Sequence, residues 1–222
     1  IMAHLSGDQN LTHAFNNNID VHSATASEIF NISLEEVTPE HRRSAKAINF
    51  GLIYGMSAFG LTRQLGIPRH EAQAYLDTYF ERYTGVRKYM DTTKELAKKN
   101  LFVETILGRK LHVSAINDSN GLRRQAAERA AINAPLQGSA ADIIRLAMIK
   151  IDNLIENDKK FKTKMLLQIH DELIFEAVAT DKDYAIKTIK DAMTSVSSSD
   201  YHMFSIPLNV SINSGTNWGE AH

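Results

Sequence analysis

Apolar residues recur at helical spacing along most of the chain, and turn-forming residues only punctuate this pattern. No low-complexity tract, internal repeat or Pro/Gly-rich linker divides it. The last quarter differs, because two short apolar runs flank an acidic turn there. The pattern predicts helices over residues 9–16, 21–31, 39–54, 68–83, 122–157 and 181–195, and a further helix that follows a break at Thr84 and Gly85 and runs through Leu96. It also predicts a short hairpin or extended loop over 102–113, and strands over 164–169, 173–178 and 206–212. Long helices first and strands late predict an α+β fold, a helical subdomain beside a small antiparallel sheet.

Local signals predict how several of these elements start, turn or break. Asp20 is expected to cap the helix that follows it, and Thr38 precedes a proline at the first helical position. Gly108 is expected at the turn of the hairpin. Pro135 and Gly138 lie inside the longest helical pattern, so that helix is expected to be interrupted or kinked there.

Composition and charge limit the class of protein to which this chain can belong and the way in which it can bind a ligand. The 222 residues fit one large domain or two small ones, because single hydrophobic cores stop growing at roughly 250 residues. The 25 Lys and Arg residues nearly balance the 26 Asp and Glu residues, so an anionic ligand must be met by a local patch. Cysteine is absent, which excludes disulfides and thiolate metal sites and favours a reducing cytoplasm. No apolar run is long enough to span a bilayer.

One predicted helix orders its chemistry along a single face. Arg42, Lys46, Phe50 and Tyr54 recur at every fourth position, about 6 Å apart at a rise of 1.5 Å per residue. The two cations lie nearest the helix N-terminus, which itself favours anions, and the two aromatic rings offer flat surfaces for a sugar or base. A nucleoside triphosphate has the same polarity. The alternative is a surface helix with solvated cations and aromatic residues in the core.

A second candidate is the acidic turn between the two late strands. Asp171 and Glu172 are adjacent carboxylates at a strand end, where Mg²⁺ can be held by one or two carboxylates together with phosphate oxygens and water. The alternative is an ordinary polar hairpin turn. Two-metal chemistry needs a further carboxylate, and no equally placed strand acid is evident.

Three segments resemble motifs of family A DNA polymerases, in the family's order. Residues 42–55, RRSAKAINFGLIYG, resemble the finger-helix motif RxxxKxxxFxxxYG, and residues 128–138, ERAAINAPLQG, are similar to the primer–template segment. His170, Asp171 and Glu172 resemble the second catalytic palm motif, and residues 215–222, GTNWGEAH, extend the match to the end of the chain. The resemblance implies a right-hand polymerase fold with mainly helical fingers beside a small antiparallel palm sheet.

The resemblance also implies roles on the finger helix. Arg42 and Lys46 would hold the triphosphate of the incoming nucleotide, Lys46 being counted among the catalytic residues as well. His22 matches the family histidine that contacts the phosphates; the alternative is a histidine at a helix start without a special role. Phe50 would pack near the sugar, and Tyr54 would stack at the nascent base pair.

Further roles follow for the other two motifs. Arg129, Asn133 and Gln137, again four apart, would line the minor groove of the primer–template; the alternative is a polar helix face. His170 would contact the primer end. Asp171 would be a catalytic carboxylate that binds metal, and Glu172 a supporting catalytic acid.

By the same resemblance, residues 1–19 form a palm-side helix, residues 20–120 the fingers, and residues 121–222 the C-terminal palm. The family's first palm motif, with its metal-binding aspartate, is expected to precede Ile1. We therefore expect a template-directed DNA polymerase of replication and repair in the parent protein, with two Mg²⁺ ions, and no activity from this chain alone. Expected partners are primer–template DNA and a dNTP, in a monomer without membrane attachment, in the bacterial cytoplasm at the nucleoid. The alternatives are a non-catalytic dNTP- and DNA-binding fragment and a single-subunit RNA polymerase.

Overall fold

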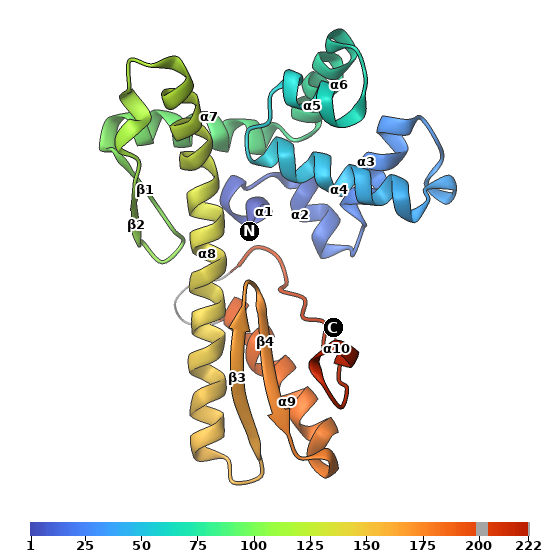
Figure 1. Cartoon of the computed structure of the whole chain (residues 1–222), viewed down its shortest axis with the longest axis vertical. Helices are drawn as coiled ribbons and strands as arrows, with labels where there is room; N and C mark the ends of the chain where they lie inside the picture. Colours follow the sequence, from blue (N-terminus) through green and yellow to red (C-terminus); the bar gives the residue numbers. More distant parts are fainter. Residues whose placement is uncertain (199–203, 222) are drawn as a thin grey trace. The chain divides into compact units, whose positions relative to one another are not determined.

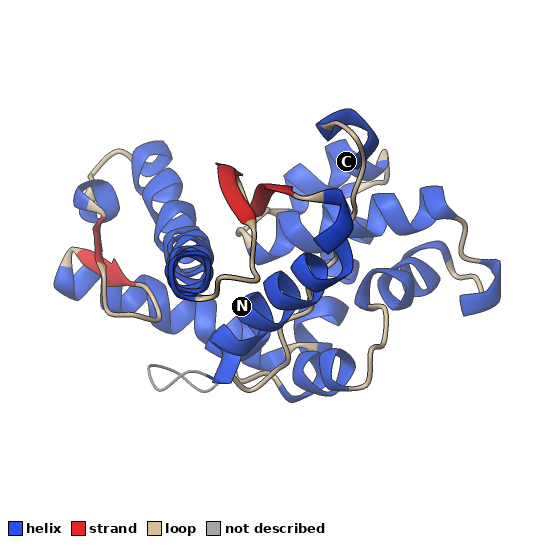
Figure 2. Cartoon of the chain, turned by 90° about the horizontal axis from the view of Figure 1, so that it is seen from below, coloured by secondary structure: helices blue, strands red, loops and turns tan. Residues whose placement is uncertain are grey.

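The computed structural model describes residues 1–198 and 204–221. It divides into two compact units, Ile1–Gly138 and Ser139–His222, and each unit is described by itself. Helix is the main element, with two short antiparallel strand pairs among the described residues (Figures 1 and 2). The predicted mainly helical α+β fold is confirmed.

The first unit is built from helices and one small hairpin (Figure 1). Two of its helices, α1 and α5, lie outside the helical ranges that the hydrophobic pattern predicted. The elements are α1 (Met2–Ser6), α2 (Gln9–Asn16), α3 (Val21–Phe30), η1 (Leu34–Glu36), α4 (Pro39–Ile53), α5 (Ala58–Leu65), α6 (Arg69–Arg82), α7 (Thr84–Asn100), β1 (Phe102–Glu104), β2 (Lys110–His112), η2 (Ser114–Asn117) and the first part of α8 (Gly121–Asn157).

The second unit holds the rest of α8 and one longer hairpin. Its core lies where α8, α9 and the hairpin meet, around Ile151, Phe161 and Ile189. The elements after α8 are β3 (Thr163–Ile169), β4 (Glu172–Ala177), η3 (Ala179–Asp181), α9 (Lys182–Thr194), η4 (Ser195–Ser198) and α10 (Trp218–Ala221).

Local chemistry accounts for most element boundaries. Asp20 caps α3 by accepting hydrogen bonds from the His22 and Ser23 amides, as predicted. Thr38 Oγ1 accepts from the His41 amide at the start of α4, which is also as predicted. Gly108 adopts a φ of 76° between β1 and β2, where its missing side chain allows the left-handed turn.

Two sequence predictions about regular structure are wrong. The predicted interruption of α8 is absent, because the helix continues through Pro135, although that residue has no N–H to donate to the preceding turn; the alternative, a kink near Pro135 and Gly138, stays a prediction. Residues 206–212 form no strand, because Pro207 lacks a ladder donor and no described strand pairs with the segment. Its apolar residues are held singly: Ile206 is buried, and Ile212 packs against the core of the second unit.

Candidate active site

Helix α4 presents the predicted cation-to-aromatic stripe on its outer face. Arg42 and Lys46 are exposed, and Phe50 is 41% exposed. The buried apolar residues of α4 are Ala45, Ile48 and Leu52, which lie on its other side. Helix α3 packs against α4. Phe50 is therefore not a core residue, contrary to the alternative reading of this helix.

Three rings and one cation form a continuous surface along α3 and α4. The ring centroid of Phe50 lies 6.0 Å from that of His22 and 6.0 Å from that of Tyr54. Lys46 Nζ lies 5.9 Å from the Phe50 centroid, within the range of a cation–π contact. The order of side chains is thus cation, then aromatic rings, as the sequence predicted.

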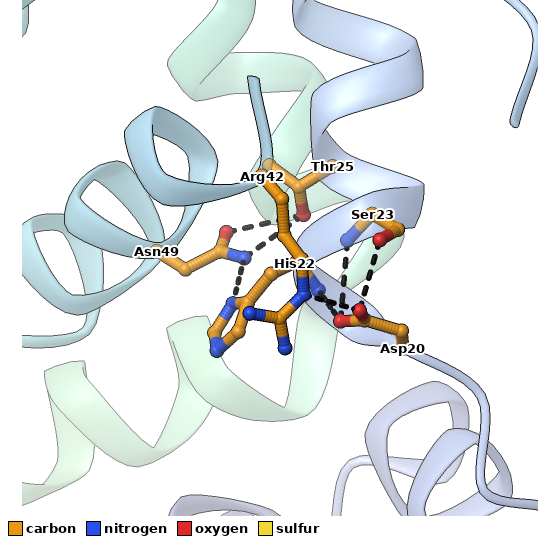
Figure 3. A network of polar contacts seen from close by, with 6 residues as sticks. All are labelled: Asp20, His22, Ser23, Thr25, Arg42 and Asn49. Carbon is orange, nitrogen blue, oxygen red and sulfur yellow. Dashed lines mark hydrogen bonds and ion pairs between the residues drawn. The ribbon is translucent and has the colours of Figure 1, made fainter. Parts of the chain in front are cut away.

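Arg42 is fixed at one end of this surface by Asp20 (Figure 3). Its Nε donates to Asp20 Oδ2, which also accepts from Ser23 Oγ at 2.9 Å. Burial alone would raise the pKa of the Asp20 carboxyl, but the hydrogen bonds from Arg42, Ser23 and His22 lower that pKa to about 2. The carboxylate therefore caps α3 and holds the guanidinium of α4 with the same group.

The buried side-chain amide of Asn49 holds His22, the other residue predicted to contact the phosphates. Asn49 Nδ2 lies 3.0 Å from His22 Nδ1 and 3.0 Å from Thr25 Oγ1 (Figure 3). Asn49 and Thr25 are each only 2% exposed. Sequence reasoning missed Asn49, although a polar residue between the buried positions Ile48 and Leu52 of an amphipathic helix is a signal that could have found it.

The surroundings of His22 keep its ring neutral at pH 7. Burial lowers the pKa of the imidazole, Asp20 raises it, and the positive charges of Arg42 and Lys46 lower it further; the net direction is downward from the ordinary value of about 6.5. A neutral ring has one donor and one acceptor nitrogen, so its hydrogen-bond partners decide which nitrogen carries the proton.

The C-terminal end of α4 meets the stripe on α8. Tyr54 Oη accepts a hydrogen bond of 2.9 Å from Gln137 Nε2. Gly55 follows with a φ of 81°, and a Cβ added there would lie 3.3 Å from Arg129 Cγ. Asn133 lies between Arg129 and Gln137 on the same face of α8, and its Oδ1 is buried with no hydrogen-bond partner in the described part of the chain.

The acidic turn lies in the second unit, between paired strands. Ile169 pairs with Glu172, so His170 and Asp171 form a two-residue turn. His170 adopts a φ of 53°, a conformation uncommon for residues other than glycine, and its carbonyl accepts from Gln168 Nε2 at 2.9 Å. Asp171 and Glu172 are both exposed. A positive φ is what the favoured two-residue hairpin turns require.

The donor chemistry of this turn fits a hard divalent cation only in part. Carboxylate oxygens are ligands that Mg²⁺ prefers, and one or two of them suffice when phosphates and water complete the shell. Within residues 1–198 and 204–221, however, no group of three or more His, Asp or Glu side chains is placed to hold a metal ion. Asp171 can therefore supply one ligand of such a site.

Comparison with known proteins identifies the family. A family model described as DNA polymerase family A matches residues 1–220. The chain belongs to DNA polymerase family A. Relatives of this family A chain include DNA polymerase I of Pseudomonas aeruginosa, 49% identical over 100% of the chain and 24% of the relative. DNA polymerase I of Rhizobium leguminosarum is 48% identical over 100% of the chain and 22% of that protein.

A solved structure agrees with the family assignment. The POL domain of Pol1 from M. smegmatis, in a complex with DNA primer-template and dNTP, has a TM-score of 0.91 and 43% identity, and the match covers 99% of the family A chain and 38% of that structure. The predicted fold class, that of a family A polymerase domain, is thus confirmed. The chain spans about a quarter of the length of the curated relatives it matches.

The residues predicted for the family A site fall into two groups. In the first unit, the α3–α4 surface and the α8 stripe come together through Tyr54; these residues are His22, Arg42, Lys46, Phe50, Tyr54, Arg129, Asn133 and Gln137. The second unit carries His170, Asp171 and Glu172 on one turn. No helix in the described part of the chain is long and apolar enough to cross a membrane.

Proposed function

We propose that the longer protein containing this chain is a template-directed DNA polymerase, which joins a primer 3′ hydroxyl to the α-phosphate of a dNTP and releases pyrophosphate. The observation that carries this proposal is the ordered surface of α3 and α4, with Arg42 and Lys46 at one end and Phe50 and Tyr54 at the other. The names of the curated relatives support it.

The cationic end of the surface suits a triphosphate. Arg42 is held through Nε, and its Nη atoms make no hydrogen bond with the described residues, so they can donate to phosphate oxygens. Lys46 adds a point charge one turn further along. His22 offers a ring N–H beside them. These three donors stabilise the charge of the triphosphate and of the departing pyrophosphate.

The aromatic end suits the nucleoside. Phe50, exposed and next to Lys46, would pack near the sugar, and Tyr54 would lie at the nascent base pair. Gln137 donates to Tyr54 Oη, so the ring that would contact the new pair is linked to the α8 stripe that would contact the primer–template. Arg129 and Asn133 extend that stripe. Polar side chains of this kind can read the acceptors of the DNA minor groove.

For metal, we propose that Asp171 binds Mg²⁺, with Glu172 as a supporting acid and His170 as a contact to the primer end. When bound, two Mg²⁺ ions would stabilise the attacking and leaving oxygens of the transfer. The tight turn between β3 and β4 holds Asp171 at the end of a hairpin, where a hydrogen bond to the His170 carbonyl restrains the backbone.

A second candidate concerns the chain by itself. Two-metal transfer needs a carboxylate besides those of the turn at Asp171, and the sequence offers none that is equally placed at a strand end, so we propose that the chain by itself binds dNTP or DNA weakly without catalysing extension. We propose that the longer protein acts as a monomer in replication or repair, in the cytoplasm at the nucleoid. Residues 20–120 would form its fingers, and residues 121–222 its C-terminal palm. Efficient incorporation of ribonucleotides would instead favour the RNA polymerase alternative.

Primer extension by the longer protein with Mg²⁺ tests the function. We expect Asp171→Asn to lower extension at least a hundredfold while DNA affinity stays within about threefold, since one metal ligand is lost and the DNA contacts are not. Glu176→Gln is the matched control, because it removes an exposed carboxylate of the same hairpin. Undiminished extension by Asp171→Asn, or an equal loss in the control, would contradict the proposal.

A further inference from the structure

Asn49 is the polar exception on the buried face of α4. It is 2% exposed and lies against Thr25 of α3, which is equally buried. A buried amide costs free energy unless its hydrogen bonds are made. Thr25 meets part of the hydrogen bonding of this amide, and the rest needs an explanation.

The contacts of Asn49 supply one. Its Nδ2 is a donor only, and it lies 3.0 Å from Nδ1 of His22, which must then accept (Figure 3). In a neutral imidazole with Nδ1 as acceptor, the proton is on Nε2. Thr25 Oγ1, within 3.2 Å of both polar atoms of the amide, holds the other side of the Asn49 side chain.

Burial and the charged groups around His22 together favour a neutral ring, so the tautomer decides which ring nitrogen can donate a hydrogen bond. Asp20 lies at the start of the same helix, α3, and Arg42 and Lys46 come from α4. Burial of the ring lowers the pKa of His22, and burial together with the two cations outweighs the effect of Asp20. The ring is thus neutral at pH 7, with a single proton to donate. In the opposite tautomer, a bare nitrogen lone pair would face any anion bound at Arg42 and Lys46.

We propose that Asn49 is a positioning residue that sets the tautomer of His22, so that Nε2–H donates to a phosphate oxygen of the bound nucleotide. This inference rests on the proposed function, since it assigns the triphosphate to the α3–α4 surface. It adds a residue that touches no nucleotide itself and acts only through the imidazole ring.

Asn49→Asp inverts the hydrogen bond and gives the proposal a distinct signature. A carboxylate at this position accepts from Nδ1–H, so neutral His22 has no proton on Nε2, while the imidazolium formed at low pH does. The quantity to measure is the ratio of the dNTP KM of Asn49→Asp to that of wild type, in steady-state primer extension by the longer protein. We expect this ratio to be about tenfold higher at pH 8.5 than at pH 6, with kcat changed less.

A double-mutant cycle covers the case in which the buried carboxylate prevents folding. Asn49→Leu keeps the number and branching of the side-chain heavy atoms and removes the donor, so we expect KM for dNTP to rise several-fold in the wild-type background and not at all beside His22→Ala. Thermal unfolding shows which variants are folded. An Asn49→Asp enzyme that keeps the wild-type KM at pH 8.5, or an equal Asn49→Leu effect in both backgrounds, overturns the inference. A wild-type enzyme that extends no primer overturns the proposed function as well.

Discussion

At the residue scale, single side chains in this chain serve two elements at once. The Asp20 carboxylate caps α3 and pairs with Arg42 of α4. The capping role could be predicted from the sequence, because a cap depends on neighbours within three positions. The ion pair could not, since it joins residues that are distant in sequence, and only the packing of α3 on α4 brings them together.

Replacing Asp20 by Asn tests this double role. Asn caps helices as well as Asp does, so only the charge is lost. The folded-state pKa of about 2 lies below the ordinary value near 3.9, so the charge stabilises the fold fully above about pH 4, and this contribution is lost as pH falls towards 2. We expect the thermal midpoint of Asp20→Asn to lie below wild type at pH 7, and the difference to narrow at pH 2.5 and vanish only below about pH 2.

Asp152→Asn is the control for that measurement. Asp152 is exposed on α8, and no hydrogen bond or ion pair involves it within the described residues. Its substitution should leave the midpoint within about 1 °C at both pH values, because isolated surface charges contribute little. A midpoint difference for Asp20→Asn that stays constant from pH 7 to pH 2.5 contradicts a role for the ionised carboxylate.

At the element scale, the junction between the end of α4 and the middle of α8 holds part of the site. Helix α4 ends at Ile53, Tyr54 and Gly55 follow, and these two residues meet α8 through Gln137 and Arg129. Start signals such as Thr38 could be predicted from local sequence. The continuity of α8 through Pro135 could not, because tertiary packing, rather than propensity, decides whether a helix tolerates proline.

Gly55→Ala tests this junction between α4 and α8. Gly55 has a φ of 81°, which strains any residue with a Cβ by about 1–2 kcal/mol, and the added Cβ would lie 3.3 Å from Arg129 Cγ. Gly66→Ala is the matched control, because Gly66 has a φ of 68° with no other atom within 4 Å of the added Cβ. Both variants should lose similar stability in denaturant unfolding. Only Gly55→Ala should weaken primer–template binding by the longer protein, and equal DNA affinities would refute the contact.

At the scale of the whole chain, a formal charge of −1 coexists with a surface suited to an anion. The cations are concentrated locally, since Arg42 and Lys46 lie together on α4, and the Asp20 carboxylate orients Arg42. The stripe on α4 and the hairpin around Asp171 could be predicted from spacing. The buried Asn49–His22 link could not, because its partners come from separate helices and share no sequence pattern.

The central claim is that the outer face of α4 binds the triphosphate of the incoming nucleotide. A single-turnover dNTP titration of primer extension by the longer protein tests it most directly, with Lys46→Met beside Lys164→Met. Lys164 is an exposed lysine of β3 that pairs with Glu176 at 3.4 Å. We expect Lys46→Met to weaken the apparent dNTP affinity or the extension rate at least about tenfold, since a charge-assisted phosphate contact is lost, and Lys164→Met to stay within twofold. Equal effects of the two substitutions, or none from Lys46→Met, would contradict the claim.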